Sequence, residues 1–234
     1  MIPIITQHAN VTVVRDDLYA GGTKARIFIP LFARYPEIVY ASPAQGGAQT
    51  ALAHAAAATG GRATIFVANR ATPHPRAIEA KRMGAAVLQV RPGYLSVVQA
   101  RAREYCAASG AWLLPFGADL PEAVDIIANA ANSLNIQPDE VWCAAGSGVL
   151  MRGLSRAWPN ARRHAVQIGR TLSPQDVAGA SIHIYPKPYD FALRGAAPFP
   201  SDPHYDAKAW EVCARKHGKG GVLFWNVTGP ASPS

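Results

Sequence analysis

The residue with the clearest potential for covalent chemistry is a lysine that follows a pair of glycines. Gly21 and Gly22 permit a sharp backbone turn with positive φ, and Lys24 stands at the start of a predicted helix over residues 24–33, with Thr23 as its N-cap. An amine held beside the free N–H groups of a helix start can have a lowered pKa and act as a nucleophile. These are the requirements of a lysine that forms a Schiff base, although a solvated lysine at a helix start has the same local sequence.

A glycine-containing turn between a strand and a helix is a second candidate. The apolar run of residues 140–145 predicts a strand, and Gly146-Ser147-Gly148 leads from it into a helix that we expect to end at Ala157. Glycines let the backbone approach a ligand, and the N–H groups at a helix start attract an anion. The pattern predicts a phosphate-binding loop, and an ordinary tight turn is the alternative.

Two further turns carry polar side chains at predicted strand ends. Residues 37–41 form an apolar run typical of a strand buried on both faces, and Ser42-Pro43-Ala44-Gln45-Gly46-Gly47-Ala48-Gln49 then opens an alanine-rich helix. Near the C-terminus, a predicted strand at 221–225 is followed by Asn226-Val227-Thr228-Gly229-Pro230. Each segment is a candidate ligand contact, and the alternatives are a glycine-rich turn without a ligand and a frayed chain end.

The elements that position these turns alternate between strands and helices. Strands are predicted at 11–15, 37–41, 63–68, 85–90, 140–145, 163–169 and 221–225, helices lie between most of them, and residues 171–205 are proline-rich and irregular. Successive strand–helix units predict parallel sheets with right-handed crossovers. We therefore expect an α/β fold with parallel sheets and helices on both faces.

Composition excludes several classes of protein. No run of about 18 apolar residues is present to cross a membrane, and the first residues lack the pattern of a signal peptide. The widely spaced Cys106, Cys143 and Cys213 favour reduced thiols in a cytoplasmic protein over a zinc site or a disulfide framework. The histidines show no metal-ligand spacing, so we expect no metal.

Positive charge is the other compositional signal. The net charge is +8, from 23 basic and 15 acidic residues. Such a surface attracts phosphate-bearing partners, including nucleic acid. The densest basic cluster lies shortly after the glycine turn and contains Arg152, Arg156, Arg162 and Arg163. Ordinary solvated helix residues are the alternative.

The N-terminal motif resembles that of fold-type II pyridoxal-phosphate (PLP) enzymes. An acidic residue, Asp and Leu, a short gap and then Gly-Gly-x-Lys-x-Arg are similar to the branch that contains aminocyclopropane-carboxylate (ACC) deaminase and D-cysteine desulfhydrase. In that branch the lysine of Gly-Gly-Asn-Lys-x-Arg carries the cofactor. Here Thr23 replaces the asparagine, and Lys24 falls on the cofactor lysine. The resemblance covers nearly the whole chain, with deletions mainly between the glycine turn and the C-terminal turn.

The resemblance also implies which residues contact PLP. The family's Gly-Ser-Gly-Gly-Thr loop, which holds the cofactor phosphate, falls on Gly146, Ser147, Gly148 and Val149, so that a valine and then Leu150 replace the fourth glycine and the threonine. Gln45 falls near an asparagine that meets the cofactor ring oxygen. Thr228 falls on the hydrogen-bond partner of the pyridine nitrogen.

Substrate contacts are implied in two other segments. The family's substrate-carboxylate loop falls on Ser42, Gln45, Gly46 and Gly47. A family tyrosine lines the substrate pocket, and Tyr189 is our candidate for it, with Tyr185 and Tyr205 as alternatives in or beside the same irregular stretch. The segment that begins at Tyr205 resembles the family's Tyr-x-x-Lys-Ala sequence.

These residues and this resemblance together predict a PLP-dependent lyase that acts at the α-carbon of an amino-acid group through a Lys24 Schiff base. Three alternatives stay open. The first is decarboxylation of a glycine-type group carried on a modified thymine in bacteriophage DNA. The second is deamination or desulfhydration of a free amino acid. The third is a protein that binds PLP without catalysis, or a plain α/β interaction protein.

Domain organisation follows from the same comparison. We expect a larger PLP-binding subdomain of residues 1–36 and 110–234, and a smaller inserted α/β subdomain of residues 37–109. We expect a homodimer in the cytoplasm, which is the host cytoplasm if a phage encodes the protein.

Overall fold

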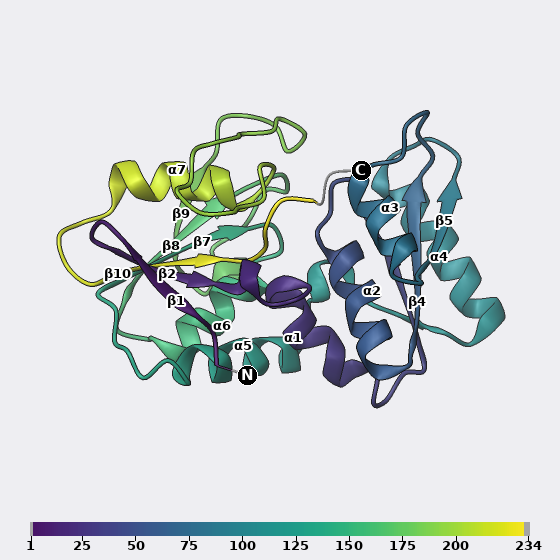
Figure 1. The fold of residues 1–234 in the computed structure, drawn as a ribbon, viewed down its shortest axis with the longest axis horizontal. Coiled ribbons are helices and arrows are strands. Elements are labelled where there is room, and N and C mark those ends of the chain that lie inside the picture. Colours follow the sequence, from purple (N-terminus) through teal and green to yellow (C-terminus); the bar gives the residue numbers. More distant parts are fainter. Residues whose placement is uncertain (1, 232–234) are drawn as a thin grey trace. The chain divides into compact units, whose positions relative to one another are not determined.

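The computed structural model describes residues 2–231, which divide into two compact α/β units (Figure 1). Unit 1 contains residues 2–23 and 119–230, and unit 2 contains residues 24–118 together with Ala231. Helix α1 (Gly22–Leu31) begins in unit 1 and continues into unit 2. Among the described residues, no helix is long and apolar enough to cross a membrane.

Unit 1 is built on a six-stranded sheet. Its spatial order is β1 (Ile5–His8), β2 (Val11–Arg15), β10 (Val222–Asn226), β7 (Glu140–Ala145), β8 (Arg162–Gln167) and β9 (Ser181–Ile184). Among the described strands of this sheet, only β1 is antiparallel to its neighbour, and the other pairs are parallel. The central strands β7 and β10 are buried along their whole length, which explains their continuous apolar sequences.

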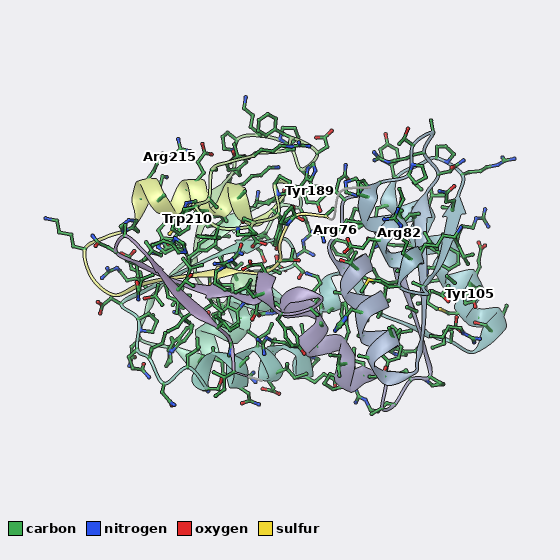
Figure 2. All side chains as sticks on the ribbon, in the orientation of Figure 1. Arg76, Arg82, Tyr105, Tyr189, Trp210 and Arg215 are labelled. Carbon is green, nitrogen blue, oxygen red and sulfur yellow. The ribbon has the colours of Figure 1, made fainter. Side chains whose placement is uncertain are left out.

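Helices cover both faces of this sheet. Figure 1 shows α7 (Asp206–Lys216) on one side, and α5 (Pro121–Asn132) and α6 (Val149–Ala157) on the other. Trp210 of α7 packs edge-on against Phe199 and Phe224, with ring centroids 4.8 and 5.3 Å apart (Figure 2). Short 3₁₀ turns follow β2 (Asp16–Leu18) and precede β9 (Gln175–Val177).

Unit 2 has a four-stranded, fully parallel sheet. Its order is β5 (Ala86–Val90), β4 (Arg62–Ala68), β3 (Glu37–Ala41) and β6 (Trp112–Leu113), and its helices are α2 (Ala48–Thr59), α3 (Pro75–Arg82) and α4 (Leu95–Ser109). Phe116–Ala118 forms a 3₁₀ turn. The buried carboxylate of Glu37 accepts hydrogen bonds from Thr64 (2.6 Å) and Tyr105 (2.8 Å), which ties β3 to β4 and α4 (Figure 2).

The α/β class with parallel sheets and helices on both faces, expected from the sequence, is therefore confirmed. The subdomain boundaries expected after residues 36 and 109 fall inside unit 2. Ring contacts give the reason. Tyr35 stacks on Trp112 with centroids 4.2 Å apart, and a Cβ at Gly61 would overlap the ring of Phe32. The segments before β3 and after α4 thus pack with the smaller sheet.

Candidate active site

Three of the turns singled out by sequence lie at one edge of the sheet of unit 1. Residues 16–23 follow β2, Gly146-Ser147-Gly148 follow β7, and Val227 and Thr228 follow β10. These three strands are neighbours and run parallel. Their carboxyl ends therefore meet at the same edge, which is where open α/β sheets bind ligands.

Buried hydrogen bonds fix the chain immediately before Lys24. The hydroxyl of Thr23 donates to Oδ2 of Asp16 over 2.8 Å, and the indole N–H of Trp225 lies 2.9 Å from Thr23 Oγ1 and 3.2 Å from the same Asp16 oxygen. The backbone N–H of Thr23 donates to the carbonyl of Val227 over 3.0 Å. Because Asp16 and Trp225 are fully buried, these bonds tie the ends of β2 and β10 rigidly to the start of α1.

The expected role of Thr23 as a helix N-cap is wrong. Helix α1 begins at Gly22, so Thr23 lies within the helix and its side chain bonds to Asp16. Gly22 has a φ of +66°, and a Cβ there would overlap the carbonyl oxygen of Val227. Lys24 is half-buried in the first turn of α1, and its Cα lies about 3.8 Å from that of Thr23 by chain geometry. The hydrogen bonds of Thr23 therefore fix the position of the Lys24 backbone.

The glycine turn after β7 is closely packed against neighbouring parts of unit 1. Gly148 has a φ of +87° at the N-cap of α6, and a Cβ there would overlap the carbonyl oxygen of Asp176. The backbone of Gly146 hydrogen-bonds to the hydroxyl of Tyr205, and a Cβ at Gly146 would lie 3.4 Å from that oxygen. Gly148, the N-cap residue of α6, has no side chain with which to cap the helix. The N–H groups at a helix start can bind a phosphate group.

Tyr205 and Asp206, at the start of α7, also lie at this edge of the sheet. Asp206 is fully buried, and its Oδ2 accepts the backbone N–H of Thr228 over 3.2 Å. Burial, and then the charge of Asp206, raise the pKa of Tyr205 well above its ordinary value. A Cβ at Gly22 would lie 3.3 Å from Thr228 Oγ1, so the threonine side chain stands beside the lysine-bearing turn. Sequence reasoning did not select Asp206, although the Tyr-x-x-Lys-Ala segment contains it.

The three candidate tyrosines have different surroundings, and Tyr205 bonds to the backbone of Gly146 as described above. Tyr189 lies against Gly169, just past the end of β8, and its carbonyl accepts a 3.1 Å hydrogen bond from the buried Lys208. Tyr189 is therefore near the edge that carries the glycine turn (Figure 2). The hydroxyl of Tyr185 donates a 2.8 Å hydrogen bond to Glu211, in the middle of α7, and so does not point to that edge.

In unit 2, the segment from Ser42 to Gln49 follows the carboxyl end of β3. Gln49 is fully buried and donates to the carbonyls of Pro43 and Ala44 over 2.9 Å each. Ser42 donates its hydroxyl to the carbonyl of Pro43, and a Cβ at Gly46 would lie 2.7 Å from Ser42 Oγ. Hydrogen bonds inside the segment thus stabilise the turn. Gln49, which the sequence did not single out as a ligand contact, makes two of these bonds.

The four arginines that are close together in the sequence do not form one cluster in the structure, because they lie on two faces of the sheet. Arg162 and Arg163 are consecutive in β8, so their side chains point to opposite faces. Arg162 donates to Glu140 over 2.7 Å on the face that α7 covers. Arg163 lies on the other face with Arg152 and Arg156 of α6.

A family model described as "Pyridoxal-phosphate dependent enzyme" matches residues 7–196. The chain belongs to this family. Its cofactor is therefore pyridoxal 5'-phosphate, as expected from the sequence. No curated protein sequence matches this chain significantly. Among the described residues, no group of three or more His, Cys, Asp and Glu is placed to hold a metal ion.

Solved structures share the fold at low identity. An ACC deaminase homologue has a TM-score of 0.81 and 18% identity, with 98% of this chain and 89% of that chain covered. Maize serine racemase has a TM-score of 0.72 and 14% identity, with 99% and 88% covered. Threonine deaminase isoform 2 from Solanum lycopersicum has a TM-score of 0.69 and 14% identity, with 96% and 75% covered. These similarities establish the fold-type II architecture.

Proposed function

We propose that this protein is a PLP-dependent lyase that breaks a bond at the α-carbon of an amino-acid group, with Lys24 as the residue that binds the cofactor. The observation that carries the proposal is the buried network of Asp16, Thr23 and Trp225, which fixes the chain directly before Lys24. A solvated surface lysine needs no such anchoring. The family match independently supplies the cofactor class.

PLP, when bound, supplies an aldehyde that reacts with amines and a conjugated ring that withdraws electrons from the α-carbon. The residues that would hold its phosphate are Gly146, Ser147, Gly148 and Val149, through backbone N–H groups at the start of α6. Thr228 would contact the pyridine nitrogen, and Gln45 the ring oxygen. Asp206 accepts the backbone N–H of Thr228 and would hold Thr228 in this position.

Lys24 would also move the proton in the reaction. Its free amine would be a base that takes up or returns a proton at the α-carbon. The substrate carboxylate would bind at the turn before α2, through Ser42, Gln45, Gly46 and Gly47, where backbone N–H groups begin a helix. Tyr189 would line the substrate pocket.

A second candidate substrate is an amino-acid group displayed on DNA, and its reaction would be decarboxylation of a glycine-type group on a modified thymine of a bacteriophage. The observation in its favour is the excess of 23 basic over 15 acidic residues, together with three arginines on one face of unit 1. Deamination or desulfhydration of a free amino acid is the first candidate. Turnover of free ACC, D-cysteine, serine or threonine, without binding of duplex DNA at low salt, would favour it.

Labelling of the lysine tests the proposal. The protein is incubated with PLP and reduced with borohydride, which makes a lysine–PLP bond permanent, and peptide mapping then locates the label. We expect it on Lys24, and we expect Lys24→Ala to lose both the label and the visible absorbance of the bound cofactor. Lys81→Ala, at an exposed position of α3, is the matched control and should keep both. A label on Lys81, Lys187 or Lys208 would show that Lys24 is not the cofactor lysine.

A further inference from the structure

A surface hollow of about 510 Å³ in unit 1 is separate from the residues of the candidate active site. Its walls are the chain before and within the first turn of α5, the outer side of α6, and β8. Three arginines, Arg152, Arg156 and Arg163, line it together with the carboxylate of Asp119. The sequence showed these arginines as a cluster, and the candidate active site uses none of them.

The arginines of this hollow are not fully neutralised. Arg152 forms an ion pair with Asp119, and Arg156 forms one with Asp125 on α5. Within the described part of the chain, the half-buried guanidinium of Arg163 has no hydrogen bond or ion pair. Two carboxylates thus face three guanidinium groups, and one positive charge remains without a counter-charge.

A second donor in the hollow also lacks an acceptor. Nε of Arg152 is enclosed and has no hydrogen-bond partner among the described residues, a state that buried donors rarely keep. Because the Arg152 side chain is 26% exposed, a small rotation can turn this N–H toward the hollow. An oxyanion next to Arg163 would then accept from both arginines.

We infer that this hollow binds a phosphate group, with Arg163 as its main charged contact and Arg152 as a second donor. The planar fork of donors on arginine matches the oxygens of a phosphate. The net charge of +8 raises the local concentration of such anions around the protein. The phosphate can belong to a small molecule or to the backbone of a nucleic acid. The inference does not depend on the chemistry at Lys24.

Two probes separate these sources, inorganic pyrophosphate and a short duplex DNA. Binding is measured by titration at low and physiological salt, on protein saturated with PLP so that the cofactor phosphate site is filled. We expect Arg163→Gln to weaken each probe that binds by about tenfold. If DNA binds, the same variant should reduce the dependence of log K on log salt by about one.

Arg162→Gln is the matched control, because it removes the same charge one residue away on the opposite face of β8. Arg101→Gln removes an exposed arginine of unit 2 and serves as a second control. Both should bind the probes within about twofold of the unchanged protein, since neither side chain lines the hollow and exposed charges outside it are screened by salt. Arg156→Gln gives a second variant in the hollow and should also weaken binding, which keeps the test valid if Arg163→Gln folds poorly.

Each outcome decides the inference. Loss of pyrophosphate binding in Arg163→Gln, with no DNA binding by the unchanged protein, supports a site for a small phosphate compound. Loss of both pyrophosphate and DNA binding in Arg163→Gln supports contact with a nucleic-acid backbone. Equal weakening by Arg162→Gln and Arg163→Gln would mean that only net charge matters, and this result, or no binding of either probe at low salt, would overturn the site. Borohydride labelling of Lys24 in the same variants should be unchanged, which separates this test from that of the cofactor lysine.

Discussion

Replacement of Thr23 by valine tests whether the buried network anchors the lysine-bearing turn. Valine has nearly the same shape but lacks the hydroxyl that donates to Asp16 over 2.8 Å and accepts from Trp225 over 2.9 Å. A hydrogen bond to a carboxylate contributes about 1.5–3 kcal/mol and a neutral one about 0.5–1.5 kcal/mol. Because the indole of Trp225 keeps its 3.2 Å contact with Asp16, we expect the free energy of unfolding to fall by about 2–4 kcal/mol.

Urea unfolding measures this loss, and borohydride labelling shows its effect on Lys24. We expect the remaining folded protein to bind PLP more weakly, because the turn before Lys24 is held less firmly. Thr12→Val is the control, since Thr12 lies on β2, the strand that leads to Asp16, and accepts an exposed hydrogen bond from Gln7. It should change the free energy of unfolding by about 0.5 kcal/mol or less. If Thr23→Val costs no more than Thr12→Val, the network does not anchor the turn.

Two further changes test the glycine turn after β7 and the pH dependence of unit 1. Gly148→Ala should reduce both PLP affinity and thermal stability, because a Cβ would overlap the carbonyl oxygen of Asp176 and alanine disfavours a φ of +87°; an unchanged cofactor titration would place the phosphate elsewhere. Burial raises the pKa of Glu140, but hydrogen bonds from Gly218, Arg162 and Trp142 outweigh it and hold the pKa at about 2. The stability from this lowered pKa is present above the unfolded pKa of 4.5 and is lost as the pH falls toward about 2. Unfolding of Glu140→Gln should therefore depend less on pH in this range, and an equal pH dependence in both proteins would contradict the assignment.

The strands of both sheets were largely predictable, and the exceptions lie at the sheet edges. Residues 37–41 and 140–145 form continuous apolar runs because β3 and β7 are buried on both faces. β9 (Ser181–Ile184) was not predicted, because it pairs on one side only and its first and last residues are exposed. Local sequence carries little signal for such a strand.

The candidate site was predictable where backbone geometry requires glycine. Gly22 and Gly148 adopt positive φ and lie in contact with other backbone, so the sequence itself marks the turns. The residues that hold these turns could not be found in this way. The hydrogen bond between Trp225 and Asp16 joins positions 209 residues apart, and no local pattern relates them. The contact of Asp206 could not be predicted either, because Asp206 begins α7 whereas its partner Thr228 follows β10.

The sequence by itself determined the class of fold, the position of Lys24 after its glycine pair, and the resemblance to PLP enzymes, because these depend on hydrophobic pattern and on residues that are unusual in their local setting. Only the tertiary structure decided which side chains share a surface. Arg162 and Arg163 are neighbours in the chain, yet the alternation of a β-strand directs them to opposite faces of the sheet, whereas Arg152 and Arg163, eleven positions apart, line one hollow. Thr23 likewise reads as a helix cap, but its buried contact with Asp16 makes it part of the anchor beneath Lys24, since packing between distant strands outweighs the local preference of one residue.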